Sequence, residues 1–443
     1  MARIIISTFS NVTWTKEKYH DSFVEGFANA LKRCGNQVLM IRTNEFVDYP
    51  VTSKLKSNIN KKKLLKSINN FNPELIITFN NSFPCEEFIT RTSCPIILYT
   101  ADGCDFFAFK DLIKKYQDRY VFFNLNESIY TSLNKHYPFI KESQYCYFGY
   151  ATDFQAKDIE QDINISFLGS IPNYTYNLAQ YFIKESSNEI KEMFFNEFDI
   201  FKQDVFSHFN VKLPNFKSET LLETLAIFLL TTKDRFEILS ELTDLGLAIY
   251  GYDSFCLAGI YNYELLKAYN FDLCVTIEQS QILFNRSKIS LNLPNARATC
   301  GFSWRVPDIL ASNSVLLSPD KKDLKTLMQG YAELPTFNSP AEAKDIAGKL
   351  LKDDVLRKEL SQASKKMIND KCRFELKFKT MQEHLKINLF PDNIGSIKHL
   401  DEKEFFNIIS IKSPKQNKIL RETSKALPYF VAKKILQRMS CDG

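Results

Sequence analysis

The sequence predicts an α/β protein made of two doubly wound domains and a C-terminal tail. At roughly 150 residues per domain, its 443 residues correspond to about three domain-sized units, or to two large domains and a tail. Short apolar runs alternate with segments of helical periodicity along most of the chain, which is the pattern of parallel sheets covered by helices. With 44% hydrophobic and 25% charged residues, the composition excludes a disordered chain or a small disulfide scaffold.

The chain opens with a β-loop-α-β unit. Residues 3–7 form a β-branched run typical of a strand that is buried on both faces. Apolar residues then recur at helical spacing within residues 20–33, and Gly35 stands where a glycine commonly ends a helix. Residues 37–41 are the next expected strand.

The same alternation continues to about residue 150. Further strands are expected at residues 75–79, 96–99 and 120–123. Helices are expected at residues 61–68, 86–90 and 107–116. These elements complete a first domain, residues 1–155, whose parallel sheet would bind ligands outside the carboxyl ends of its strands.

A second series of strands and helices predicts a second domain at residues 156–388. Its strands are expected at residues 163–168, 247–250, 273–275, 289–293 and 315–318. A helical insertion at about residues 182–232 interrupts the series after the first strand. Two such domains in tandem predict a cleft between them.

The remaining residues, 389–443, predict a tail without strand-helix alternation. Between Lys412 and Arg438, eight basic residues stand against the single acidic residue Glu422. One face of the helix predicted there is apolar, and its lysines lie largely outside that face. Such a helix suits an anionic membrane surface, where each basic residue contributes about 1 kcal/mol. The alternative is that its apolar face packs on the body of the protein.

Composition and motifs argue against several classes of protein. The 13 glycines compare with about 31 at average usage, and the chain has no P-loop, G-x-G-x-x-G, H-E-x-x-H or G-x-S-x-G motif. There is no Asp-x-Asp signature for a metal, and a net charge of +5 is too weak to indicate a nucleic-acid partner. The ten scattered cysteines predict buried free thiols in a reducing compartment. Because no apolar run has the length of a signal peptide or a membrane span, we expect a cytoplasmic protein.

The most informative stretch is residues 284–319. A strand there ends in a polar loop, which leads into a helix expected at residues 304–311. The loop and the helix start carry five candidate binding residues: Asn295, Arg297, Ser303, Arg305 and Asp308. Arginines and the amides of a helix start could hold a diphosphate, and Asp308 could accept a ribose hydroxyl or pair with Arg305. The alternative is an ordinary loop with a surface ion pair.

Five runs in the second half of the chain form a recognisable pattern: residues 165–170, 248–252, 283–292, 303–318 and 339–358. They resemble the GT-B glycosyltransferases, in particular the CgeB-like branch of the group 1 superfamily. The resemblance implies two Rossmann-like domains facing each other across a cleft, of which the second binds a nucleotide sugar and the first an acceptor.

The resemblance also implies roles for individual residues. Gly169 and Ser170 would approach the diphosphate or the sugar, Arg305 would neutralise phosphate, and Asp308 would take the place of the family's acidic contact to the ribose or sugar. The remaining residues of the implied donor site are Tyr252, Asn295, Arg297 and Ser303. Two positions depart from the family pattern: Asp308 is one methylene shorter than the commoner Glu, and Asn313 replaces a turn glycine and is able to adopt the left-handed conformation that glycine would supply.

Sugar transfer with inversion would need a base that deprotonates the acceptor hydroxyl. Asp102 and Asp105 are candidates in the loop after the strand at 96–99, and His20 is a third at the start of the helix after the first strand. The alternative roles are loop capping for the two aspartates, and helix capping or surface exposure for His20.

We therefore expect a glycosyltransferase that needs no metal or other cofactor and moves a sugar from a nucleotide-sugar donor to a glycan or lipid-linked glycan acceptor. The expected setting is bacterial surface polysaccharide synthesis, of capsule or lipopolysaccharide, with residues 412–439 at the inner face of the plasma membrane. Two alternatives stay open: a nucleotide-sugar 2-epimerase, and a catalytically silent scaffold of the same fold.

Overall fold

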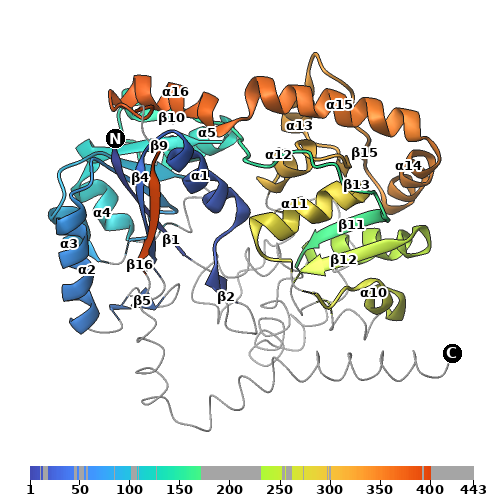
Figure 1. Cartoon of the computed structure of the whole chain (residues 1–443), viewed down its shortest axis with the longest axis horizontal. Coiled ribbons are helices and arrows are strands. Elements are labelled where there is room, and N and C mark those ends of the chain that lie inside the picture. The colour runs from blue at the N-terminus through green and yellow to red at the C-terminus, as the bar shows by residue number, and fades with distance from the viewer. Residues whose placement is uncertain are drawn as a thin grey trace, which may run out of the picture. The chain divides into compact units, whose positions relative to one another are not determined.

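The computed structural model of the chain contains two compact units (Figure 1). It describes residues 1–9, 11–12, 18–43, 47–48, 54–55, 58–83, 85–100, 107, 109–125, 127–170, 231–251, 255, 262–272, 274–296, 298, 301–391 and 394–400. Unit 1 comprises residues 1–155, 275–281 and 365–422. Unit 2 comprises residues 156–274, 282–364 and 423–443.

Unit 1 is built on a parallel sheet of seven strands in the order β10-β9-β8-β7-β1-β4-β16. The strands are β1 (Arg3–Thr8), β4 (Gln37–Arg42), β7 (Leu75–Phe79), β8 (Ile96–Tyr99), β9 (Tyr120–Asn124), β10 (Tyr145–Tyr147) and β16 (Ser396–Leu400). Two short antiparallel pairs accompany the sheet, β2 (Asn11–Val12) with β3 (Lys18–Tyr19), and β5 (Val47–Asp48) with β6 (Lys54–Leu55). The predicted doubly wound fold of the first domain is confirmed.

One face of this sheet is covered by α1 (Ser22–Arg33) and α16 (Phe374–Leu385). Their contact is aromatic: Phe27 of α1 packs edge to face on Phe374 and Phe378 of α16, with ring centroids 5.3 and 5.1 Å apart. Phe79 and Tyr99 from the sheet join the same cluster. These contacts explain part of the high phenylalanine content, and they place α16 in unit 1, whereas residues 365–388 were expected in the second domain.

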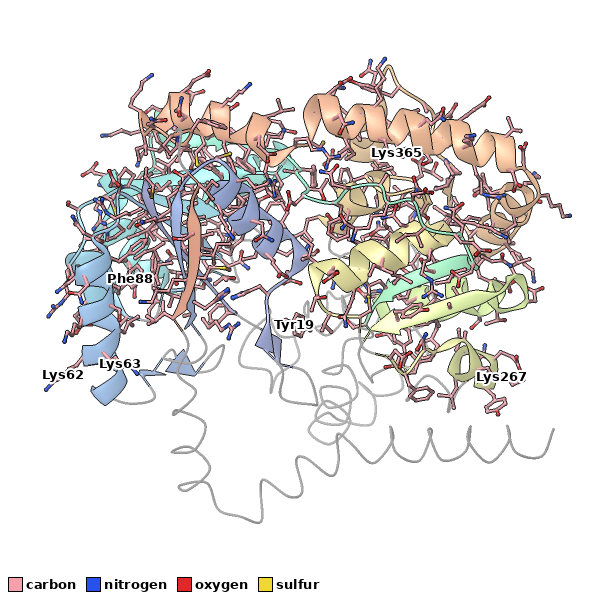
Figure 2. The ribbon with its side chains drawn as sticks, in the orientation of Figure 1. Tyr19, Lys62, Lys63, Phe88, Lys267 and Lys365 are labelled. Atoms are coloured by element: carbon pink, nitrogen blue, oxygen red, sulfur yellow. The ribbon has the colours of Figure 1, made fainter. Side chains whose placement is uncertain are left out.

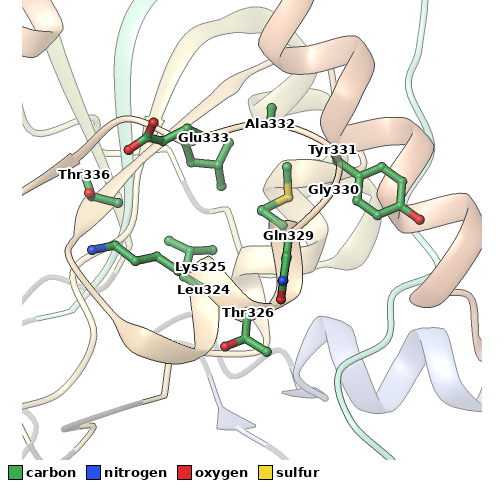
Figure 3. A pocket seen from close by; sticks show the side chains of 11 residues that line it. Leu324, Lys325, Thr326, Gln329, Gly330, Tyr331, Ala332, Glu333 and Thr336 are labelled. Atoms are coloured by element: carbon green, nitrogen blue, oxygen red, sulfur yellow. The ribbon is translucent and has the colours of Figure 1, made fainter.

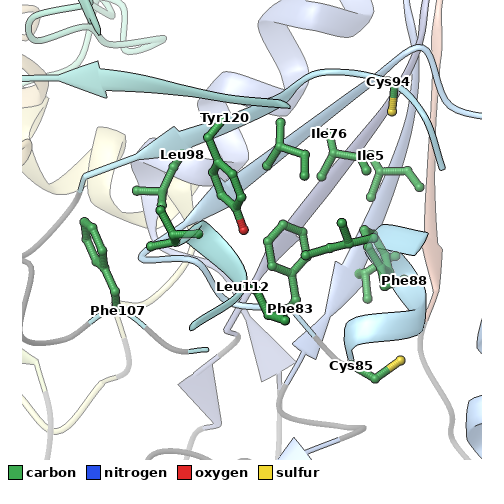
Figure 4. Close-up of a cluster of buried hydrophobic side chains, with 14 of the residues drawn as sticks. Ile5, Ile76, Phe83, Cys85, Phe88, Cys94, Leu98, Phe107, Leu112 and Tyr120 are labelled. Atoms are coloured by element: carbon green, nitrogen blue, oxygen red, sulfur yellow. The ribbon is translucent and has the colours of Figure 1, made fainter. Parts of the chain in front are cut away.

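The other face is covered by α2 (Asn58–Phe71), α3 (Glu86–Thr90), α4 (Lys110–Lys115) and α5 (Glu127–His136). Figure 4 shows the buried cluster between these helices and the sheet, in which Phe83 and Phe88 face Ile5 and Ile76. Figure 2 shows Lys62 and Lys63 projecting from α2 into solvent, while Phe88 of α3 is fully buried. In the described parts of α2 and α3, the polar residues thus face solvent and the apolar residues face the sheet.

The chain returns to unit 1 through β16, which pairs with β4. The buried Asn36 anchors this return, since its amide donates to Leu31 O and to Leu389 O, at 2.8 Å for the latter, and its carbonyl accepts from Ala2 N. The backbone of Ser396 donates to Asn36 O at 3.2 Å. The sequence did not predict this strand, which lies in the tail where no strand-helix alternation is expected. It is difficult to predict because β16 is an edge strand with most of its residues exposed, so its sequence has no buried apolar run.

Unit 2 holds a parallel sheet of five strands in the order β12-β11-β13-β14-β15. The strands are β11 (Ile163–Gly169), β12 (Leu247–Gly251), β13 (Ser287–Leu291), β14 (Val315–Pro319) and β15 (Thr336–Phe337). The helices that follow these strands are α10 (Tyr263–Ala268), α11 (Ile277–Arg286), α12 (Arg305–Leu310), α13 (Lys322–Met328), α14 (Pro340–Lys352) and α15 (Asp354–Lys371), and residues 231–241 are also helical. The start of α11 and the end of α15 fall within the ranges of unit 1. The second doubly wound domain is therefore present too.

Two local features of the second predicted domain differ from what the sequence indicates. Cys274 and Val275 are not in a strand, because Thr276 and Gln279 cap α11 reciprocally and draw the preceding residues into the helix entry. Asn313 is not in the left-handed region. Its turn is held instead by side-chain contacts, as its amide donates to Lys157 O at 2.7 Å and its backbone N–H donates to the side chain of Asn285.

The predicted thiols are confirmed for six of the ten cysteines, which are buried and form no disulfide: Cys34, Cys85, Cys94, Cys146, Cys274 and Cys372. Burial raises the pKa of Cys34, Cys146 and Cys372 to about 11 in each case, so these thiols stay protonated near neutral pH. Within the described residues, no helix is both long and apolar enough to cross a membrane.

Candidate functional site

The sheet of unit 2 reverses its direction of winding between β11 and β13. The chain passes from β11 to β12 on one side of β11, and then to β13 on its other side. Doubly wound sheets bind ligands at such a switch point, outside the carboxyl ends of the strands. In unit 2 the residues at this edge include Gly169, Ser170, Gly251 and Leu293.

Two glycines bring the backbones of β11 and β12 close together at this edge. Gly169 and Gly251 are register partners in the strand pair. A Cβ atom on Gly251 would lie 1.7 Å from the carbonyl oxygen of Gly169, and Gly251 has a φ of +143° that side chains rarely adopt. A Cβ atom on Gly169 would lie 2.5 Å from the ring of Phe167. The packing at both positions therefore requires glycine.

Arg235 links the two strands of the switch point. One terminal nitrogen donates to Ser170 O after β11, and the other donates to Leu293 O after β13 at 2.9 Å. Its guanidinium carbon lies 5.8 Å from the ring centroid of Phe167, a cation–π distance. The Nε atom of Arg235 is buried without a hydrogen-bond partner among the described residues.

Arg305 adds a second positive charge to this edge. It is the first residue of α12. Burial is the largest cause that lowers the pKa of Arg235, and the positive charge of Arg305 lowers it further, whereas the negative charge of Asp234 raises it. The pKa of Arg235 falls to about 10. Two guanidinium groups that repel each other in a partly desolvated site favour an anionic ligand, because an anion would compensate both charges.

A polar network holds the loops that follow β13 and β14. The hydroxyl of Ser303 donates to the side chain of Asn292 at 2.9 Å, and the amide of Asn292 donates to Ser318 Oγ at 3.3 Å. The backbone N–H of Ala298 donates to Asn295 O at 2.8 Å, and the Lys321 ammonium donates to Ala298 O at 2.8 Å. These bonds fix the start of α12, and with it Arg305, relative to the strand ends.

The predicted donor residues fall into three groups. Gly169, Ser170, Asn295, Ser303 and Arg305 lie in the segments that leave the carboxyl edge of the sheet. Asp308 is on α12 but only 2% exposed, which leaves little of its side chain for a ligand. Tyr252 and Arg297 lie outside the described residues.

Sequence reasoning missed Arg235. The chain there reads Thr-Thr-Lys-Asp-Arg, and nothing in this polar run separates a buried arginine from its exposed neighbours. Only the three-dimensional contacts with Ser170 and Leu293, which are 65 and 58 residues away in sequence, reveal its role.

The three candidate bases belong to unit 1. Asp102 and Asp105 lie outside the described residues. His20 follows β3 and precedes α1; Figure 2 labels its neighbour Tyr19. His20 is 4% exposed, and burial together with the charges of Arg42 and His399 lowers its pKa to about 3. So weak a base is poorly matched to deprotonating a hydroxyl near neutral pH.

A hollow of about 650 Å³ lies elsewhere in unit 2, between α13 and β15 (Figure 3). Leu324, Met328, Tyr331 and Leu334 supply much of its lining. None of the predicted donor residues lines it, so the chemistry of the candidate site is independent of this hollow. In the described part of the chain, no group of three or more His, Cys, Asp or Glu side chains is arranged to hold a metal ion.

Comparison with known proteins gives a family match over part of the chain and a resemblance in fold. Residues 235–381 match the family model described as "Glycosyl transferase-like", and this match begins at Arg235. A search of curated sequences finds no match.

Solved structures resemble most of the chain. Sucrose-phosphate synthase from Thermosynechococcus elongatus is 10% identical, with a TM-score of 0.50, over 86% of this chain and 98% of that one. The T4 phage β-glucosyltransferase in complex with UDP-glucose is 13% identical, with a TM-score of 0.46, over 87% and 99% of the two chains.

The lipopolysaccharide glycosyltransferase WaaG is 8% identical, with a TM-score of 0.44, over 86% of this chain and 99% of its own. The expected resemblance to GT-B glycosyltransferases is confirmed, and the narrower CgeB-like branch stays a prediction. Residues 235–381 thus match a glycosyl transferase-like family model, and the chain has the two-domain α/β fold of the GT-B enzymes.

Proposed function

We propose that this protein transfers a sugar from a nucleotide-sugar donor to a glycan acceptor, and that Arg235 and Arg305 bind the donor's diphosphate. The observation that carries the proposal is that both arginines lie at the switch point of the second sheet, near enough for the charge of Arg305 to lower the pKa of Arg235. A diphosphate has acceptor oxygens on both phosphorus atoms, which suits two guanidinium groups that each present several donors.

The same arginines suit the chemistry of transfer. When the bond between the anomeric carbon and the β-phosphate oxygen breaks, negative charge accumulates on the departing nucleoside diphosphate. Fixed positive groups beside that phosphate stabilise the transition state more than the ground state. Arg235 is held by two carbonyl oxygens and a phenylalanine ring, so it needs little reorganisation at the moment of reaction.

Three finer points belong to the same proposal. The arginines would supply the positive charge that a divalent cation supplies in other sugar transferases, so we propose that transfer proceeds without a metal. The acceptor would be a glycan or a lipid-linked glycan of a bacterial surface polysaccharide such as capsule or lipopolysaccharide. Residues 412–439, which lie outside the described residues, would hold the protein at the inner face of the plasma membrane.

Isothermal titration with nucleoside diphosphates and their sugar conjugates tests the donor site. We expect Arg305→Gln to weaken the preferred nucleotide about 10- to 100-fold, since charge-assisted hydrogen bonds contribute about 1.5–3 kcal/mol. Arg235→Lys should weaken it as well, because the lysine keeps the charge but loses the fork that bridges Ser170 and Leu293.

The matched control is Arg286→Gln. Arg286 belongs to the same unit and pairs with Asp162 at 2.5 Å, but it directly precedes β13 and so lies at the amino end of that strand. Its loss should leave nucleotide affinity unchanged. Affinity for no nucleotide at all, or equal losses in the Arg286 and Arg305 variants, would exclude the proposed donor site.

A further inference from the structure

A second group of basic side chains lies at the carboxyl edge of the other sheet, in unit 1. It consists of His20, which precedes α1, Arg42 at the end of β4, and His399 near the end of β16. The imidazole rings of His20 and His399 stack with centroids 6.1 Å apart and an interplanar angle of 22°. The proposed donor site uses none of these three residues.

The register of the sheet places Arg42 and His399 on one face. His399 pairs with Met40 of β4, and Arg42 is two residues beyond Met40 on that strand. Because side chains alternate along a strand, Met40, Arg42 and His399 point to the same side of the sheet. The neighbouring residue Lys398 pairs with Leu39 and points to the opposite side.

His20 is the buried member of the group, and its polar atoms are not satisfied. The residue is only 4% exposed, and neither ring nitrogen has a hydrogen bond of good geometry among the described residues, although the backbone of Phe9 lies close enough to the ring to raise its pKa slightly against the larger effects of burial and charge. Buried polar groups are nearly always paired, because an unpaired one costs about 1–3 kcal/mol. An imidazole whose hydrogen-bonding capacity is not fully used, beside a guanidinium and a second imidazole, indicates a ligand that accepts hydrogen bonds.

We propose that His20, Arg42 and His399 form an oxyanion site that binds a phosphate group carried by the acceptor substrate. The oxygens of a phosphate could accept bonds from donors on three separate elements at once, which a carboxylate with two oxygens does less well. The assignment to the acceptor rests on the proposed transferase function, whereas the anion site itself does not. The acidic residues at the start of α1 are the exposed Asp21 and the half-buried Glu25, and burial raises the pKa of Glu25 against a smaller opposing effect of the Ile277 backbone.

Imidazole nitrogen NMR on the full chain tests the site with inorganic phosphate as the probe. The chain has five histidines, so signals from His20 and His399 can be assigned with His20→Asn and His399→Asn variants. Titration at constant ionic strength near pH 7 should shift both signals along one saturable curve. The bound anion should raise the pKa of His20 from about 3, since it favours the imidazolium.

Three variants make the titration specific. Arg42→Gln should weaken phosphate at least about tenfold, in line with the loss of a charge-assisted bond, whereas Lys398→Gln, on the other side of the same edge strand, should have no effect. His399→Asn changes an exposed residue and should also weaken binding, which keeps the test valid if Arg42→Gln fails to fold. Arg305→Gln should leave the shifts intact, because it belongs to the donor site.

The proposal is overturned if neither histidine signal moves saturably, or if Lys398→Gln weakens phosphate as much as Arg42→Gln. Loss of the shifts in Arg305→Gln would place the phosphate at the donor site and equally reject the acceptor site. Acetate binding as tightly as phosphate would reject the preference for phosphate. A normal phosphate titration together with no nucleotide affinity in calorimetry would leave the anion site standing and remove only its assignment to a sugar acceptor.

Discussion

At the scale of single residues, two glycines and two arginines determine the structure of the proposed donor site at the carboxyl edge of the sheet in unit 2. Gly169 and Gly251 let two strand ends approach more closely than side chains would permit. Arg235 occupies the space beside them and bridges Ser170 to Leu293. The low glycine content of the chain therefore does not weaken the proposed site, which uses two glycines where the backbone requires them and arginines for the charge.

Replacing Gly251 with alanine should destabilise unit 2 strongly. The new Cβ would overlap Gly169 O, and the residue would keep a φ of +143°, so we expect a loss of about 3 kcal/mol or more. Gly348→Ala is the matched control: its Cβ meets nothing within 4 Å in the middle of α14, and it should stabilise by about 0.5–1 kcal/mol. Urea denaturation followed by circular dichroism measures both. Equal midpoints for the two variants would show that β11 and β12 do not approach as closely as described.

His20 should make stability fall as the solution is acidified. Its pKa is 6.5 in the unfolded chain and about 3 in the folded one, so the unfolded state binds more protons at any pH between these values. The contribution of neutral His20 to the free energy of unfolding is fully present above about pH 7. It declines below that pH, by about 2 kcal/mol between about pH 7.5 and 5.

The His20→Gln variant should lack that part of the decline in phosphate-free buffer, and the difference between its urea midpoints and those of the wild type at each pH measures it. Parallel pH profiles for the two proteins would mean that His20 titrates normally and is not buried as described.

At the scale of elements, the sequence predicts what depends on local periodicity. The runs at Ile96–Tyr99 and Glu86–Thr90 are strand and helix over the residues expected, because buried β-branched runs and a short amphipathic turn are visible locally. β16 escapes prediction because it is an edge strand with most of its residues exposed. Arg235 escapes because its partners are distant in sequence, and the His20–Arg42–His399 group escapes because it needs the register of β4 with β16.

Removing β16 should leave β4 with an unpaired edge. A chain truncated after Pro391 loses the pairing of β16 with β4 and the bond from Ser396 N to Asn36 O, whereas a chain truncated after Leu400 keeps both. We expect the shorter chain to melt at lower temperature and to associate with itself, since exposed strand edges pair with one another. Thermal unfolding and light scattering of the two truncated proteins, compared side by side, test this; identical behaviour would mean that β16 does not stabilise unit 1.

At the scale of the whole molecule, the net charge is small, but basic side chains are concentrated at one edge of each sheet. The chain carries 57 basic and 52 acidic residues, yet each unit gathers arginine or histidine side chains at the carboxyl edge of its own sheet. Arg235 and Arg305 do so in unit 2, and His20, Arg42 and His399 do so in unit 1. The account therefore predicts two anionic substrates, one for each sheet: a nucleotide diphosphate and a phosphorylated acceptor.

The central claim is that the paired arginines hold a nucleotide sugar whose glycosidic bond to phosphate is broken. Phosphorus and proton NMR of the full chain incubated with a panel of nucleotide sugars follows that bond directly. The account predicts that one donor is converted to its nucleoside diphosphate with release or transfer of the sugar, and that Arg305→Gln slows this conversion at least about a hundredfold, a loss of about 2.7 kcal/mol in transition-state stabilisation. Persistence of every donor, its conversion only to an epimeric sugar nucleotide, or an unchanged rate in Arg305→Gln would contradict it.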